Sequence, residues 1–192
     1  MRRPAGEAGE ALMRLMIAAV GRLKDAEREL SERYVERFDA AGRALKLGPL
    51  QICEIPEGRA ATAELRKADE AQRLLKAAAG ADVTVALDEG GRSLSSETFA
   101  SLLAKERDGG ARTMAFLIGG PDGHGEGTLA AAKLRLSLGA MTLPHGLARI
   151  VLIEQLYRAA TILSGHPYHR ALGSVALRNR RACPHRSLEC VK

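Results

Sequence analysis

The sequence contains no tryptophan, and aromatic residues make up only 3% of its 192 residues. Because hydrophobic residues still reach 46%, aliphatic side chains and alanine must build the core. No apolar run approaches the roughly 18 residues that a membrane-spanning helix needs, and the start lacks the h-region of a signal peptide. The cysteines, Cys53, Cys183 and Cys190, show no CxxC spacing. We therefore expect a reduced, cytoplasmic compartment, no membrane association and no metal site.

The net charge of +6 is unevenly distributed. Residues 1–12 are neutral, and residues 171–192 carry five basic side chains against one acidic side chain, which leaves +2 for residues 13–170. A short charged end is typical of a solvated segment. We predict one domain at 13–170, a disordered extension at 1–12 and a disordered basic tail at 171–192.

Apolar runs and helical periodicities alternate along the domain. The expected strands are 15–21, 50–55, 83–88, 113–118 and 134–138. The expected helices are 25–45, 62–79, 95–107 and 144–163, with Leu65, Leu74 and Leu75 facing inward from the second. This alternation predicts an α/β fold with a parallel sheet covered by helices on both faces. Ligands of such sheets bind at the carboxyl ends of the strands.

Three glycine-containing loops follow the third, fourth and fifth strands, with the sequences LDEGG (87–91), GGPDG (119–123) and GAMTL (139–143). No GK[ST] follows the glycines, which excludes a phosphate-binding P-loop. No acidic strand end follows about 20 residues later, which disfavours a nicotinamide dehydrogenase. Loops of this composition offer backbone groups and apolar walls, which suit a flat heteroaromatic ring such as adenine, or a cationic ligand.

The strings FLIGGPDGHG, LSLGAMTLPHGLARIVLIEQLYRA and HPYHR, with LMIAAVGRLKD and VALDEGGRSLSSETFA, resemble one family. They are similar to the bacterial 23S rRNA pseudouridine N3-methyltransferases, the RlmH type of the SPOUT superfamily. The resemblance covers residues 13–170. It implies a C-terminal trefoil knot, a homodimer and S-adenosyl-L-methionine as methyl donor. The implied substrate is a pseudouridine of 23S rRNA within the assembled 70S ribosome.

The resemblance also assigns roles to residues. The implied cofactor-binding residues are Leu87, Gly119, Gly120, Leu138, Gly139, Ala140, Met141, Thr142 and Leu143. The implied catalytic residues are His145, Tyr168, His169 and Arg170. By itself Leu87 is equally well a core residue, and His145 is a helix cap or surface residue. Arg149 is a candidate contact to RNA phosphate or a solvated arginine, and Glu154 and Arg158 have the spacing of a helix-surface ion pair.

The implied reaction is attack of the pseudouridine N3 on a sulfonium methyl group, which requires in-line positioning and loss of the N3 proton. His169 is the first candidate for the base and His145 the second, with solvent as a further acceptor. The alternative from another class is a non-catalytic ribosome-binding or assembly factor that retains the fold. Donor binding distinguishes the two.

Overall fold

The computed structural model describes residues 12–168 of the chain. Strands and helices alternate along this part, as the sequence predicts. The strands are β1 Met13–Val20, β2 Leu47–Ile55, β3 Val83–Ser93, β4 Thr113–Ile118 and β5 Leu134–Ser137. The helices are α1 Asp25–Gly42, η1 Arg43–Leu45, α2 Ala63–Ala77, α3 Ser96–Asp108, α4 Glu126–Ala131 and α5 His145–Leu163. The predicted disorder of the two extensions falls almost wholly outside the described residues.

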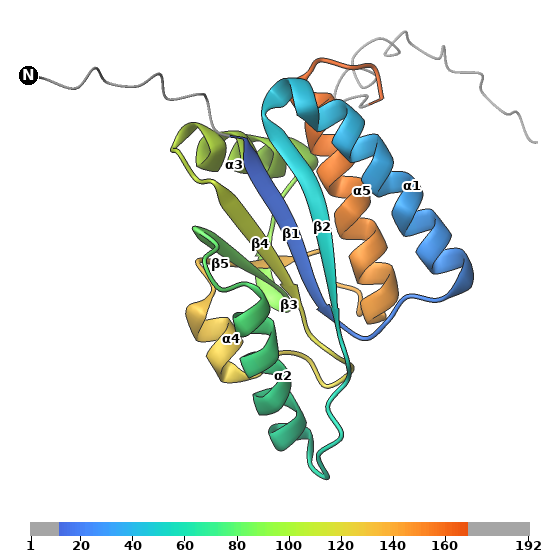
Figure 1. Ribbon diagram of the computed structural model, residues 1–192, viewed down its shortest axis with the longest axis vertical. Coiled ribbons are helices and arrows are strands. Elements are labelled where there is room, and N and C mark those ends of the chain that lie inside the picture. Colours follow the sequence, from blue (N-terminus) through green and yellow to red (C-terminus); the bar gives the residue numbers. More distant parts are fainter. Residues whose placement is uncertain (1–11, 169–192) are drawn as a thin grey trace, which may run out of the picture.

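The five strands form one parallel sheet in the order β2-β1-β4-β3-β5. Because all strands run the same way, their carboxyl ends meet at one edge, which lies at the lower ends of β1 and β2 in Figure 1. The loops 21–24, 56–62, 94–95, 119–125 and 138–144, together with segment 88–93 at the end of β3, are called the carboxyl edge here. The carboxyl edge is where the sequence places the site.

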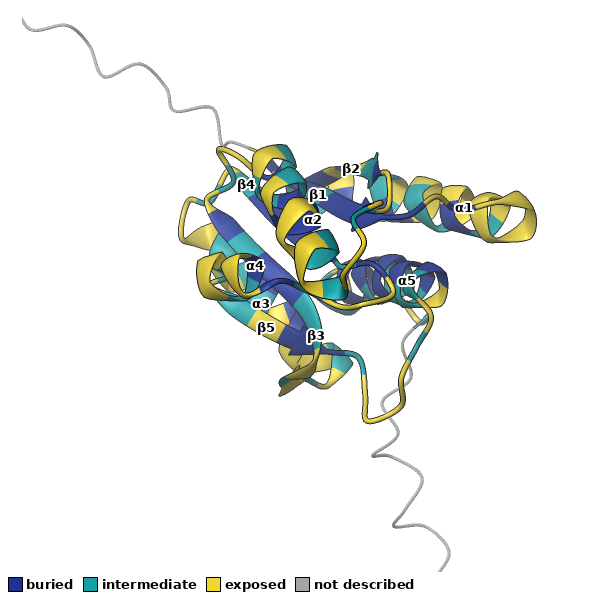
Figure 2. Ribbon diagram, turned by 90° about the horizontal axis from the view of Figure 1, so that it is seen from below, coloured by how far each residue is buried: buried dark blue, intermediate teal, exposed yellow. Residues whose placement is uncertain are grey.

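Helices cover both faces of the sheet, with α1, α3 and α5 on one face and α2 and α4 on the other. Alternate residues of β1 serve the two faces, since Leu15 and Ile17 pack with α1, α3 and α5 whereas Ala18 and Val20 pack with α2. This alternation follows from the two-residue period of a strand. Figure 2 shows α5 and the central strands as mostly buried, and α1 as exposed on its outer side.

Two helix starts follow their sequence signals. The side chain of Thr62 accepts a hydrogen bond from the Leu65 amide, and that of Ser95 accepts one from the Thr98 amide. The predicted inward position of Leu65 is wrong, because this side chain is 59% exposed. The inward face of α2 begins one turn later, at Glu70, Ala71 and Leu74.

Strand β3 runs five residues beyond its predicted end and turns closely around β5. Leu136 pairs with Leu87 and pairs again with Arg92, five residues further along β3. A Cβ atom on Gly91 would lie 2.8 Å from the backbone C of Arg135 and 2.8 Å from the backbone N of Leu136. The segment 88–93 therefore crosses against the β5 backbone at a point where only glycine fits.

Candidate functional site

Leu87 lies at the centre of the predicted site. It pairs with Ile118 at the end of β4 and with Leu136 near the end of β5. With about 4.8 Å between neighbouring strands, the loops that follow β4 and β5 leave the sheet about 10 Å apart, one on each side of β3. The structure thus brings Leu87 close to the start of both predicted cofactor loops.

The loop after β4 is a tight turn fixed by its own backbone and by α2. The Gly123 amide donates to the Gly120 carbonyl at 2.9 Å, and Gly123 has a positive φ of 81°. Arg66 Nε donates to Asp122 Oδ2 at 2.7 Å. This hydrogen bond lowers the pKa of Asp122 below its ordinary value. The turn is therefore stabilised by hydrogen bonds within the chain itself.

Gly120 faces the protein's own buried groups. A Cβ atom there would lie 2.9 Å from Glu70 Oε2 and 3.1 Å from Val20 Cγ1. The buried Glu70 carboxylate also accepts a hydrogen bond from the Gly58 amide at 2.7 Å. A side chain at position 120 would displace Glu70, so a substitution of Gly120 would disturb the packing of the chain's own residues.

The loop after β5 is open. The Ser137 hydroxyl donates to the Gly139 carbonyl at 3.0 Å and accepts from the Gly139 amide, which fixes the turn. Gly139 has a φ of 139°, and a Cβ atom on it would meet nothing within 4 Å. Ala140 and Thr142 are exposed, and the Met141 side chain is 81% exposed. This loop, residues 138–144, which we call the lip, exposes apolar side chains and backbone groups at the carboxyl edge.

Arg149 anchors the start of α5 and is fully buried. Its guanidinium pairs with Glu54 at 2.8 Å and donates to the carbonyls of Val20 and Gly21. Burial lowers the pKa of Arg149, and the Glu54 carboxylate acts in the opposite direction. Both interpretations of Arg149 from the sequence, a phosphate contact and a solvated side chain, are therefore wrong. The residue ties α5 to the carboxyl ends of β1 and β2.

His145 begins α5 directly after Pro144. The ring is half-buried against the turn after β1, where a Cβ atom on Gly21 would lie 2.6 Å from His145 Nε2. The glycine at position 21 therefore makes room for the imidazole, and His145 lies at the carboxyl edge beside the lip.

Tyr168 follows α5 in the chain and packs back against the later half of that helix, away from the lip. Its hydroxyl donates to Glu154 Oε1 at 3.2 Å, and its ring centroid lies 4.8 Å from that of Tyr157. Arg158 donates to the same Glu154 oxygen at 2.5 Å, which confirms the predicted ion pair. Burial, together with Tyr34 and Glu154, raises the pKa of Tyr168 to about 12, so it is protonated at neutral pH. His169 and Arg170 lie outside the described residues.

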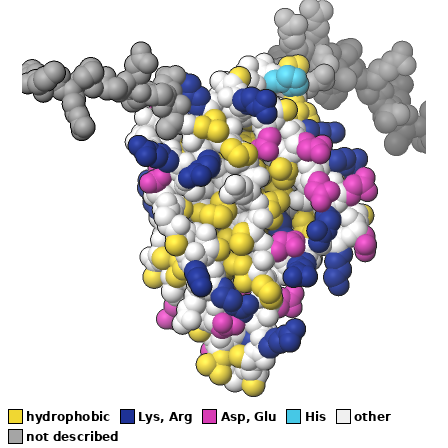
Figure 3. All heavy atoms as spheres, in the orientation of Figure 1, with side chains coloured by type: hydrophobic (Ala, Val, Ile, Leu, Met, Phe, Trp, Pro, Cys, Tyr) yellow, Lys and Arg dark blue, Asp and Glu magenta, His cyan; other side chains and the backbone are white. Residues whose placement is uncertain are grey.

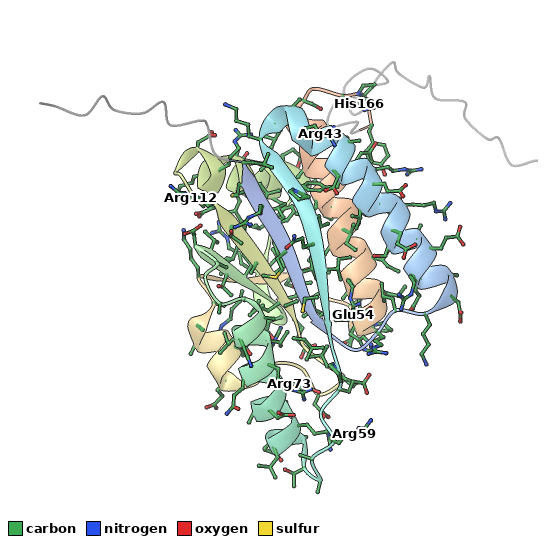
Figure 4. All side chains as sticks on the ribbon, viewed as in Figure 1. Arg43, Glu54, Arg59, Arg73, Arg112 and His166 are labelled. Carbon is green, nitrogen blue, oxygen red and sulfur yellow. The ribbon has the colours of Figure 1, made fainter. Side chains whose placement is uncertain are left out.

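The predicted residues thus form two groups in one chain. The helix α5 has 19 residues and is about 28 Å long. The lip lies at its start, and Tyr168 contacts its later half. Figure 4 shows Glu54 beside the first turns of α5 and His166 beyond its opposite end.

Two further features were not expected from the sequence. The ring nitrogens of His124 are buried, without a hydrogen-bond partner among the described residues. Burial lowers the pKa of His124 below 6.5, against smaller effects of the Leu87 and Leu117 backbone and of Asp88. A cavity of about 340 Å³ also opens between Ser93, α3, the lip and α5. Ser95 and Ser96 carried a sequence signal, but that signal indicates only a helix start.

A family model described as a predicted SPOUT methyltransferase matches residues 13–169. The chain belongs to the SPOUT methyltransferase family. It is 52% identical over 160 residues to proteins named Ribosomal RNA large subunit methyltransferase H from Brucella anthropi and from Xanthobacter autotrophicus. Each alignment covers 83% of this chain and 100% of the relative.

A probable methyltransferase from Bordetella pertussis has the same fold, with a TM-score of 0.50, 14% identity and coverage of 79% of this chain and 98% of that chain. Within residues 12–168 of this SPOUT methyltransferase, no three His, Cys, Asp or Glu side chains are placed to hold a metal ion. Over the same residues, no helix is long and apolar enough to cross a membrane.

Proposed function

We propose that this protein transfers a methyl group from S-adenosyl-L-methionine to N3 of a pseudouridine in 23S rRNA of the assembled ribosome, in the cytoplasm. The observation that carries the proposal is the 52% identity, over their full length, to relatives named Ribosomal RNA large subunit methyltransferase H. The carboxyl edge supports it, because Leu87 and the loops after β4 and β5 meet there.

The residues present fit the donor. The open space at Gly139 and the exposed Met141 leave backbone and apolar groups of the lip available to an adenine ring. The residues that would hold the donor are Leu87, Gly119, Gly120, Leu138, Gly139, Ala140, Met141, Thr142 and Leu143. When bound, the donor would supply the methyl group of its sulfonium, and the rest of the donor would be left as a neutral thioether.

The protein must remove the N3 proton and hold the nitrogen in line with the methyl group. Tyr168 is unsuited to act as the base at neutral pH, because its pKa is raised to about 12 and its proton is shared with Glu154. Its role is to hold the segment that carries His169 and Arg170. His169 and His145 are the candidate bases.

The separation of the lip from Tyr168 supports a shared site in a homodimer, in which the partner supplies the Tyr168 group. We test this by mixing a Gly139→Val protomer with a His169→Ala protomer. A side chain at Gly139 meets no neighbour but strains a positive φ, so it alters the lip and not the core. Each homodimer should be inactive. A heterodimer should have one intact site out of two and therefore about half of the wild-type activity. No rescue in verified heterodimers would refute the shared site.

The low net charge of the domain supports the assembled ribosome, rather than isolated RNA, as the substrate. Residues 13–170 carry only +2. On the face that Figure 3 shows, acidic and basic side chains are interspersed. Binding to RNA through phosphates scales with the charges neutralised, so this domain should depend on the shape of the ribosome. We expect methylation of 70S ribosomes and little methylation of isolated 23S rRNA. Equal turnover on both would contradict the assembled substrate.

The decisive experiment combines calorimetry with S-adenosyl-L-methionine and mass spectrometry of 23S rRNA from cells with and without the gene. Donor binding and loss of the methyl group in the deletion strain are the expected results. A protein that binds ribosomes but no donor would instead be the non-catalytic assembly factor.

We infer that the chain also contains the trefoil knot of its family. The support is the close contact between segment 88–93 and the β5 backbone at Gly91. This contact places β5 and the residues that follow it directly beside the part of the chain that leaves β3. An experimental chain trace in which 138–144 does not pass through the loop formed by residues 88–119 would refute the knot.

A further inference from the structure

The cavity of about 340 Å³ lies on the α3 and α5 face of the sheet and shares two residues with the lip. Its lining residues are Ser93, Leu94, Ser95, Ser96, Phe99, Leu136, Ser137, Leu138, Gly139, Val151, Leu152 and Gln155. Since Leu138 and Gly139 belong to both places, a molecule in the cavity would touch the loop that is proposed to hold the methyl donor.

The chemistry of the lining selects an uncharged ligand. None of the lining residues is Lys, Arg, Asp, Glu or His. A phosphate would find no cation there. Leucine, valine and phenylalanine form apolar walls, while serine hydroxyls and one amide supply hydrogen bonds. This combination suits a neutral heterocycle with hydrogen-bonding edges.

Gln155 is the polar group with the most directional capacity. Its Oε1 accepts from the Ser96 hydroxyl at 2.8 Å, and its Nε2 donates to Glu154 Oε2 at 2.7 Å. An amide has two acceptor positions and two N–H donors, so one of each is left over. Ser96 and Glu154 fix the orientation of the amide, because each bonds to one end of it.

The same hydrogen-bond chain reaches the C-terminal cluster. Glu154, which holds the Gln155 amide, also accepts from Tyr168 and from Arg158. The cavity and the Tyr168 group are therefore joined through α5, although the lip and Tyr168 are separate.

Pseudouridine differs from uridine in one edge that an amide can read. Its sugar is attached through carbon, so N1 carries a proton beside the C2 carbonyl, whereas N1 of uridine is the glycosidic nitrogen. Gln155 offers an acceptor for that N1–H and a donor for the carbonyl. We propose that the cavity receives the pyrimidine base of the substrate and that Gln155 distinguishes pseudouridine from uridine. This inference rests on the proposed function.

The test compares 70S ribosomes that carry the pseudouridine with ribosomes that carry uridine at that position. Wild-type protein should prefer the former. Gln155→Ala should lower kcat/KM for pseudouridine about 10-fold to 100-fold and reduce the preference, because one hydrogen-bonded donor loses its partner. Ser96→Ala should give a smaller effect in the same direction. Donor affinity by calorimetry should be unchanged in both variants.

Gln72→Ala is the matched control, because Gln72 is an exposed glutamine on α2. It should leave both substrates unaffected. A loss of donor affinity in Gln155→Ala would show that the cavity holds the donor and would overturn the inference. An equal fall in kcat/KM for both ribosomes, with the preference for pseudouridine unchanged, would show that Gln155 does not recognise the N1–H and would overturn the inference. A wild-type protein that methylates neither ribosome would refute the proposed function itself.

Discussion

Arg149 and Glu70 are charged residues that the fold buries at the carboxyl edge. A guanidinium in a helix is normally expected in solvent. The partner of Arg149 is Glu54, 95 residues earlier, and its other partners are backbone carbonyls at the end of β1. Such a pairing depends on how β1, β2 and α5 meet in space. The sequence therefore indicated where the edge lies but not which polar residues hold it together.

Replacing Arg149 with alanine should lower the free energy of unfolding by about 3 kcal/mol, since the change leaves the carbonyls of Val20 and Gly21 without this donor and removes the buried guanidinium from Glu54, which keeps only the Leu23 amide and the more distant Arg28. Urea denaturation measures the effect. Arg73→Ala is the control, because the Arg73–Asp69 pair is partly exposed and should contribute under about 1 kcal/mol. Losses of similar size in the two variants would show that Arg149 is not a structural anchor.

His124 should make stability depend on pH. Its pKa is lowered by burial, so between 6.5 and the lower folded value the unfolded chain binds more protons than the folded chain. The free energy of unfolding is therefore unaffected by protonation of His124 above about pH 6.5, where the ring is neutral in both states, and falls as the pH drops towards the folded pKa. Unfolding free energies measured from pH 7.5 to 5 should fall less steeply in His124→Phe.

The comparison for this pH dependence is His166→Ala, in which an exposed histidine is removed. Its pH dependence should match that of the wild type. If His124→Phe and the wild type have parallel profiles, His124 is not the group responsible.

At the scale of elements, the sequence predicted the strands and the long helices, because their apolar periodicities are strong. It did not predict α4, whose six residues include glycine and threonine and which packs against α2. It ended β3 too early, at residue 88, since the glycine pair was assigned to the loop that follows the strand. The strand order was also beyond prediction, because pairing of β1 with β4 and of β3 with β5 joins segments far apart in the chain.

The crossing of β3 and β5 predicts a contrast between two adjacent glycines. A Cβ atom on Gly91 would overlap the β5 backbone, whereas one on Gly90 would meet only Asp88 Oδ2 at 3.5 Å. Gly91→Ala should therefore lose about 1 to 3 kcal/mol of stability, and Gly90→Ala less than about 0.5 kcal/mol. Urea midpoints provide the measurement. Equal midpoints would mean that β3 does not cross β5 so closely.

For the whole molecule, the rule that ligands bind at the carboxyl ends of parallel strands pointed to Leu87 and the lip, and the structure places both at one edge of the sheet. His145, which only the resemblance singled out, lies at the same edge. The rule could not show that Tyr168 packs against Glu154 and Tyr157 in the later half of α5, far from the lip. Nothing in the HPYH motif indicates which face of α5 the chain packs against after the helix ends. The cavity beside Gln155 was equally hidden, since its walls come from β3, α3, β5 and α5.

A chain shortened to residues 13–170 should fold, dimerise and methylate ribosomes with activity within threefold of the full chain. The family match and the resemblance are complete within these residues. Size-exclusion chromatography and ribosome methylation assays provide the measurements. Aggregation, or activity more than tenfold lower, would show that one of the two extensions, 1–12 or 171–192, is part of the working enzyme.

The three tyrosines of the chain, Tyr34, Tyr157 and Tyr168, lie in one cluster, with ring centroids 6.2 Å apart for Tyr34 and Tyr157 and 4.8 Å apart for Tyr157 and Tyr168. Because there is no tryptophan, intrinsic fluorescence excited at wavelengths that phenylalanine does not absorb originates from these tyrosines. The fluorescence of the unlabelled protein should therefore report on the docking of the segment before His169 and on little else. Ribosomal proteins also fluoresce, so stopped-flow mixing with 70S ribosomes would need the variant Tyr168→Phe as the reference signal.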